Sequence, residues 1–258
     1  MSPIFSSDLI KMQRSKFWGI VILFPFMILA GITLLLILNF QDIQQDVRQG
    51  KSYSIWGVMW MVTYYSNFVM IHLFATILTS FLANMEHQAN AWKLLFSMPI
   101  SRVKFYWTRY FWIISGVSLS GLFLMLGLWL IGVMFGGGET LNWSRLFYFT
   151  MFPYLSSFAL IGFQLWLSMN MKNQSIPIIT GGLGIVVGLF MLPLPGIPQY
   201  LPWVIPYQIT FSDENIISNF AQIVNPPNIH WEWVGISLIV SFILVSFGSF
   251  QFARKEVI

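Results

Sequence analysis

Two long apolar segments are joined by NMEHQANAWKLLFSMPISRVKFYWTRY, residues 84–110. Read as a helix, the first half of this stretch has an apolar stripe made of Met85, Ala89, Trp92 and Phe96. A polar stripe, about 100° further round the helix, contains Glu86, Asn90, Lys93 and Ser97. This pattern predicts an amphipathic helix at a membrane interface. Its apolar side would face lipid or neighbouring spans, and Glu86 and Lys93 would face water or a partner.

A proline separates this helix from the next one. The helix is expected to end before Pro99, because proline lacks an amide proton and disfavours helical backbone at the preceding Met98. Ser101 is a candidate N-cap for the following helix, which starts with the basic residues Arg102 and Lys104. The chain is therefore predicted to re-enter the membrane from a basic turn.

The composition of the whole chain indicates a membrane protein. Of its 258 residues, 57% are hydrophobic and only 9% are charged, whereas soluble domains contain about 25% charged residues. The charges cluster and leave several windows of about 20 residues without any, which is typical of transmembrane helices. The absence of cysteine excludes disulfides, zinc thiolates and iron–sulfur clusters.

We expect an all-α integral membrane protein with one transmembrane domain. The six predicted spans are residues 18–38, 55–83, 106–135, 147–169, 176–192 and 233–252. Residues 1–17 are predicted to form an interfacial helix, and residues 84–101 a cytoplasmic segment. Residues 193–232, which contain seven of the twelve prolines, are interpreted as extracellular or re-entrant. The helix that begins near Ser101 is longer than the bilayer core. We expect Lys104, Tyr106, Trp107 and Arg109 to project into or beyond the headgroups.

The distribution of basic residues predicts the topology. Six spans place ten of the thirteen lysines and arginines on the side that contains both termini, residues 84–110 and the turn at Lys172. The positive-inside rule makes that side cytoplasmic. The net charge of +4 is then a topology signal, and no nucleic-acid partner is needed to explain it.

Polar residues inside the spans allow two interpretations. Tyr64, Tyr65, Asn67, His72 and Gln164 either line a conduit or hydrogen-bond to one another between helices. For His72, a packing role is favoured over a proton relay or a metal site. The predicted spans contain no aspartate or glutamate, and the chain has no Ser/His/Asp set and no glycine-rich nucleotide loop. A membrane enzyme and a metal site are therefore both disfavoured.

Two segments carry a resemblance to a known family. Residues 86–102, EHQANAWKLLFSMPISR, and residues 200–206, YLPWVIP, resemble type-2 ABC transporter permeases. Within that family the chain is most similar to the permeases of lantibiotic-immunity and bacitracin-resistance exporters. The resemblance covers the N-terminal helix, six spans, the cytoplasmic helix after the second span and the re-entrant segments before the sixth.

The resemblance implies a transport subunit of the bacterial cytoplasmic membrane with both termini in the cytosol. Such a permease binds no cofactor itself, pairs with a second permease, and works with two ATPase subunits that bind ATP and Mg. The residues that would contact the ATPase are Glu86, His87, Asn90, Trp92, Lys93, Pro99 and Arg102. The implied cargo is a membrane-active antimicrobial peptide. Exporters of drugs, lipids or polysaccharide share the architecture, and an immunity protein that works without an ATPase is a rival interpretation.

Overall fold

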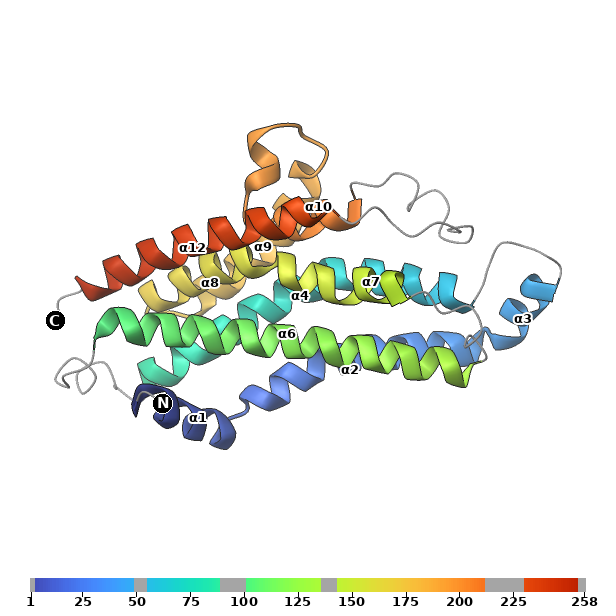
Figure 1. Cartoon of the computed structure of the whole chain (residues 1–258), viewed down its shortest axis with the longest axis horizontal. Helices are drawn as coiled ribbons and strands as arrows, with labels where there is room; N and C mark the ends of the chain where they lie inside the picture. The colour runs from blue at the N-terminus through green and yellow to red at the C-terminus, as the bar shows by residue number, and fades with distance from the viewer. Residues whose placement is uncertain (1–2, 49–54, 89–100, 136–142, 212–229, 255–258) are drawn as a thin grey trace.

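The computed structural model describes residues 3–48, 55–88, 101–135, 143–211 and 230–254. All of the secondary structure in these residues is helical, which confirms the predicted all-α class. The helices are α1 (Pro3–Arg14), α2 (Phe17–Leu38), α3 (Phe40–Arg48), α4 (Ile55–Gln88), α6 (Arg102–Met134), α7 (Trp143–Ser156), α8 (Phe158–Asn170), α9 (Ser175–Met191), the 3₁₀ helix η2 (Ile197–Tyr200), α10 (Ile205–Phe211) and α12 (Trp231–Ala253). The long helices run side by side as a bundle, with α1 and the end of α12 at one end and α3 at the other (Figure 1).

Within the described residues, five helical stretches are long and apolar enough to cross a membrane. These are Phe17–Leu38, Ile55–Glu86, Arg102–Met134, Trp143–Asn170 and Trp231–Ala253. The predicted number of six spans is therefore not confirmed. Helix α9 is apolar but has only 17 residues, and at 1.5 Å per residue it is about 25 Å long, against a hydrocarbon core of about 30 Å.

The start of α6 confirms one local prediction and shows which helices surround its first turns. The Ser101 side chain accepts a hydrogen bond from the Lys104 backbone N–H, so the predicted N-cap is present. Tyr106 and Arg109, which were predicted to lie at or beyond the headgroups, are buried within the bundle. Their depth relative to the headgroups stays a prediction. They are buried because α1 and α12 pack against these first turns of α6.

The predicted fourth span is two helices, α7 and α8, which meet at Ser157. Pro153 lies inside α7 and has no N–H to donate to the Phe149 carbonyl, one turn earlier. Asn67 of α4 fills this position, because its Nδ2 donates to the Phe149 carbonyl oxygen at 2.9 Å. A side chain of α4 thus compensates for a hydrogen bond that the α7 backbone cannot make.

Two serines of α12 compensate for the break between α7 and α8. The Ser237 hydroxyl accepts from the Ala159 N–H at 3.0 Å and donates to the Ser156 carbonyl at 2.6 Å. Ser241 donates to the Phe158 carbonyl at 2.8 Å. Backbone groups that lose their helical partners in a membrane must find others. These contacts explain how an interrupted helix remains inside the bundle.

Candidate functional site

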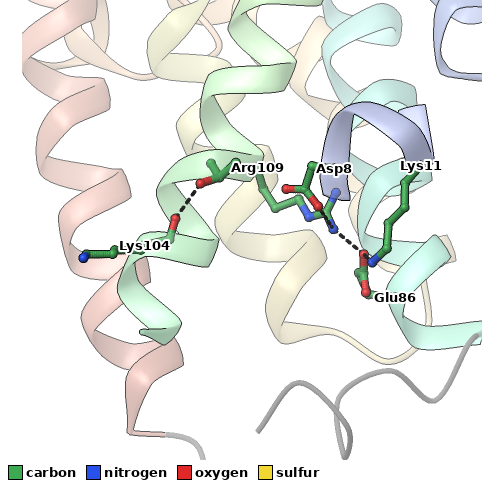
Figure 2. A network of polar contacts seen from close by, with 6 residues as sticks. Asp8, Lys11, Glu86, Lys104 and Arg109 are labelled. Carbon is green, nitrogen blue, oxygen red and sulfur yellow. Dashed lines mark hydrogen bonds and ion pairs between the residues drawn. The ribbon is translucent and has the colours of Figure 1, made fainter. Parts of the chain in front are cut away.

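Three helices converge on a group of buried charges at the end of the bundle where α1 lies. We call Asp8, Lys11, Glu86 and Arg109 the charge cluster (Figure 2). Asp8 and Lys11 come from α1, Glu86 from the last turn of α4, and Arg109 from the start of α6. Asp8 faces the bundle because it shares one side of α1 with Met12, four residues later and fully buried.

Arg109 is the centre of the cluster. Its Nη2 lies 3.1 Å from Asp8 Oδ1 and forms an ion pair with Glu86 Oε1. Lys11 Nζ also reaches Glu86 Oε1, at 3.2 Å. The side chains of Asp8, Glu86 and Arg109 are at most 3% exposed, whereas that of Lys11 is 41% exposed. Two acids and one base are buried, and the half-exposed Lys11 supplies the second positive charge at the edge of the cluster.

Burial and neighbouring groups affect Asp8 and Arg109 in different ways. Burial raises the pKa of the Asp8 carboxyl above its ordinary value of 3.8, although Arg109 and Lys11 act in the opposite direction. The guanidinium carbon of Arg109 also lies 4.7 Å from the centre of the Phe105 ring, within cation–π range. Arg109 is thus held by two carboxylates and an aromatic ring.

The cluster flanks the stretch that was predicted to contact an ATPase. Glu86 lies near the end of α4, before this stretch, and Arg109 lies in α6, after it. A second contact links the start of α6 to another helix, because Arg102 Nη1 donates to the Ala253 carbonyl at the end of α12, at 3.1 Å. A force applied to residues 89–100 would therefore reach α4 and α6 directly, and α1 and α12 through these side chains.

The structure corrects the predicted orientation of Glu86. This side chain was expected to face water or a partner, but it is buried and paired with Arg109 and Lys11. The reason is that α4 continues to Gln88, beyond the predicted end of the span at residue 83, so Glu86 still faces the bundle. Glu86 is also an acid within a candidate span, where none was expected.

The other predicted contact residues are described only in part. Arg102 is at the start of α6, and His87 is in the last turn of α4 with its side chain outside the described residues. Asn90, Trp92, Lys93 and Pro99 lie outside the described residues altogether. Their predicted role at an ATPase interface stays a prediction.

Four of the five conduit candidates are inside the bundle. Tyr64, Asn67, His72 and Gln164 are buried, whereas Tyr65 is 56% exposed on the outer surface and does not join them. Asn67 donates a hydrogen bond to the Phe149 carbonyl, and His72 forms hydrogen bonds through both ring nitrogens.

Sequence reasoning missed three members of the cluster as site residues, namely Asp8, Lys11 and Arg109. Asp8 is the sole acid among residues 1–17 and lies four residues before the apolar Met12. The four-residue spacing between Asp8 and Met12 indicated that the aspartate would lie on the side of the helix that faces the bundle. Arg109 lies among aromatic residues in a helix longer than the membrane core, which was interpreted as a headgroup position. The sequence could not show that α1 and α4 would supply its partners.

In the part of the chain that the structure describes, no group of three His, Cys, Asp or Glu residues is placed to hold a metal ion. A sequence profile described as ABC-2 family transporter protein matches residues 4–190. No curated protein matches the chain.

Proposed function

Because the chain belongs to the ABC-2 family of transporter proteins, as a membrane subunit without an ATPase domain, we propose that it is the permease of an ATP-driven exporter. ABC-2 permeases pair with ATPase subunits, so hydrolysis takes place on a separate chain. The match over residues 4–190 is the observation that carries the proposal.

The proposed route of coupling runs through residues 84–101 and the charge cluster. The ATPase contacts His87, Asn90, Trp92, Lys93, Pro99 or their immediate neighbours, and Arg102 begins the helix that follows. Glu86, which is buried, acts through the charge cluster. ATP binding and hydrolysis move this stretch. The proposal is supported by the ion pairs at its two flanks, because Arg109 holds α4, α6 and α1 together. The three helices would then move as one unit, without separate contacts between each helix and the ATPase.

The assembly contains two permeases and two ATPases in the bacterial cytoplasmic membrane. The excess of basic residues on one side supports cytoplasmic termini. The proposed cargo is a membrane-active antimicrobial peptide of the lantibiotic or bacitracin kind, with immunity or resistance as the outcome. This finer assignment is supported by the resemblance of residues 86–102 to that branch and by spans rich in aromatic residues and poor in charge.

The test is purification of the tagged chain from its native host in mild detergent, followed by identification of the co-purifying proteins. We expect an ATPase subunit in stoichiometric amount. The variants Glu86→Gln and Trp92→Ala should insert normally but fail to protect cells against the peptide. Glu232→Gln is the matched control, because this glutamate is exposed in the first turn of α12.

Two results would overturn the proposal. A chain that repeatedly purifies alone, and still protects cells lacking candidate ATPases, is an immunity protein that acts without ATP hydrolysis. Full protection by both Glu86→Gln and Trp92→Ala, with the ATPase still bound, would remove the coupling role of this stretch.

A further inference from the structure

A stripe of uncharged polar side chains runs along α4 inside the bundle. We call it the α4 stripe; its members, all at most 3% exposed, are Asn67, His72, Thr76 and Ser80. His72, Thr76 and Ser80 are spaced by four residues and so lie along one side of the helix. Asn67, five residues before His72, is turned away from them and bonds to the Phe149 carbonyl of α7. No charged residue occurs between residues 55 and 85. The stripe therefore provides uncharged hydrogen-bonding groups. It lies in a membrane-spanning helix, where burying a polar group costs free energy unless the group has a hydrogen-bond partner.

Part of the chain itself covers this stripe at His72, whereas Thr76 packs against Gly181 of α9 and Ser80 lies beside Ser168 of α8. We call residues 197–208 the covering segment; it contains η2 and the start of α10. His72 Nε2 donates to the Trp203 carbonyl at 2.9 Å, and its Nδ1 lies 2.8 Å from the Tyr207 hydroxyl. The oxygen of that hydroxyl is 2.7 Å from the Phe68 carbonyl oxygen, and the Phe68 and Tyr207 rings stack with centres 3.8 Å apart.

These contacts reveal which chemistry the stripe accepts. The partners of His72 are a backbone carbonyl and a phenolic hydroxyl, and an aromatic ring lies flat against Phe68. All three are groups that a peptide with an aromatic side chain carries. The covering segment thus occupies the α4 stripe as an intramolecular peptide ligand would.

Some hydrogen-bonding capacity near the segment is unused. Among the described residues, Asn67 Oδ1, Thr76 Oγ1 and both amide atoms of Gln164 have no hydrogen-bond partner. Ser80 of α4 and Ser168 of α8 lie 3.3 Å apart, and Thr76 and Gln164 are each one turn earlier on these helices. Since α4 and α8 run in the same direction, Thr76 and Gln164 belong to the same seam. Asn67, Phe68, Ile71, Pro153, Pro206 and Tyr207 surround a gap next to the covering segment that is too small for a water molecule.

We propose that the α4 stripe is a binding site for an apolar peptide that presents a backbone carbonyl and an aromatic hydroxyl, and that the covering segment fills this site until such a peptide displaces it. The proposal rests on the proposed transport function, because it assigns a cargo contact to the permease. The unpaired groups of Asn67, Thr76 and Gln164 would supply the additional hydrogen bonds that an incoming peptide requires.

Two glycines of α9 make room for the covering segment. A Cβ at Gly184 would overlap the Trp203 indole, and a Cβ at Gly188 would overlap the Tyr207 ring. Gly182, on the same helix, has nothing within 4 Å of its added Cβ. Gly184→Ala and Gly188→Ala should therefore push the covering segment from the stripe, whereas Gly182→Ala serves as the matched control.

The test uses the full chain in lipid nanodiscs and the acetylated, amidated octapeptide LPWVIPYQ, which copies residues 201–208 and carries a photoreactive benzophenone. Labelled sites are mapped by mass spectrometry. We expect the octapeptide to label residues 67–76. Gly184→Ala and Gly188→Ala should each raise the yield of labelling about tenfold, because overpacking weakens the binding of the covering segment to the stripe. Gly182→Ala should label like the unchanged chain. A scrambled octapeptide measures non-specific labelling.

A second measurement works even if the glycine variants fail to fold. The chain has no native cysteine, so Phe68→Cys with Tyr207→Cys can be bridged by a short thiol crosslinker that holds the segment in place. Bridging should abolish the labelling and reduction should restore it. A bridge between Tyr110→Cys and Ser241→Cys, whose native hydroxyl groups are in contact away from the stripe, should have no effect.

The proposal is overturned if labelling is the same with the bridge closed and open, if it falls outside α4, or if the scrambled octapeptide labels equally well. The assay needs no ATPase. A chain that binds the octapeptide but purifies without an ATPase therefore contradicts the proposed transport function while leaving this site intact.

Discussion

At the scale of single residues, the main feature is a set of charges buried where three helices meet. Arg109 is fully buried between Asp8 and Glu86. Removing charges from water costs several kcal/mol per ion, and mutual attraction offsets this cost only when every charge is paired. The cluster is therefore a poor source of net stability. Its consequence is specificity, because a displacement of one helix leaves a buried charge without its partner.

Arg109→Ala should destabilise the chain by about 3–5 kcal/mol, because it leaves two carboxylates with Lys11 alone. Thermal unfolding in detergent measures the loss. The triple variant Asp8→Asn, Glu86→Gln and Arg109→Gln should recover most of it, because it leaves no buried charge unpaired. A triple variant as unstable as Arg109→Ala would contradict the electrostatic explanation.

Asp8 should make stability depend on pH. Its folded-state pKa is above 3.8, so the folded chain takes up this proton at a higher pH than the unfolded chain does. Protonation of Asp8 therefore contributes to the free energy of unfolding. This contribution is fully present below the pKa of the unfolded state and is lost as the pH rises through the higher pKa of the folded state. Unfolding measured between pH 4 and 7 should show the unchanged chain gaining stability relative to Asp8→Asn as the pH falls. A constant difference would contradict this prediction.

At the scale of elements, the break between α7 and α8 depends on side chains of neighbouring helices. Because Pro153 has no N–H, the Phe149 carbonyl accepts a hydrogen bond from Asn67 instead. Ser237 and Ser241 of α12 form hydrogen bonds with backbone groups of Ala159 and Phe158, next to the break. Because α4 and α12 supply these bonds, the broken helix cannot move independently of them. We infer that its two halves are held in one orientation by partners that the local sequence does not contain.

The link between Asn67 and Pro153 can be measured. Asn67→Ala should cost about 1–3 kcal/mol, because the buried Phe149 carbonyl loses a donor. In the Pro153→Ala background this cost should be smaller by about 1 kcal/mol, because residue 153 then has an N–H for the same carbonyl. The free energies of unfolding of the unchanged chain, the two single variants and the double variant give the coupling energy between Asn67 and Pro153. Strictly additive costs would show that Pro153 is not the reason for the Asn67 contact.

At the scale of the whole molecule, contacts between helices bear on the number of membrane crossings. The Trp166 indole N–H donates to the Gln251 side chain at 2.7 Å, so the ends of α8 and α12 are neighbours. The ring of Trp231, at the start of α12, lies 4.6 Å from that of Phe152 in α7. The chain leaves α8 at one end of the bundle and enters α12 towards the other, so residues 171–230 must return along it. We propose that α9 makes the sixth crossing in this return.

Cysteine labelling tests the crossing and the topology together. Single cysteines are introduced at Trp143, Lys172, His230 and Arg254 of this cysteine-free chain. A membrane-impermeant maleimide should label positions 143 and 230 in intact cells, and positions 172 and 254 only after lysis. If α9 does not cross, positions 172 and 230 will be labelled from the same side.

The sequence by itself determined the class of the fold, because apolar windows of about 20 residues without charge are typical of transmembrane helices. It also determined the Ser101 cap and, through residues 86–102, the resemblance to the transporter family that the profile match then confirmed. These properties are local: each depends on a short run of residues and the solvent around it.

Only the tertiary structure decided the partners of the polar groups. Glu86 faces Arg109, although its stripe indicated water, and His72 bonds to Trp203 and Tyr207, more than 130 positions away. A helical pattern shows which side chains share a side, but not which helix will pack against it. Buried polar groups must find hydrogen-bond or ion-pair partners wherever the fold brings them. The charge cluster and the α4 stripe therefore exist only after α1, α4, α6 and α10 have come together.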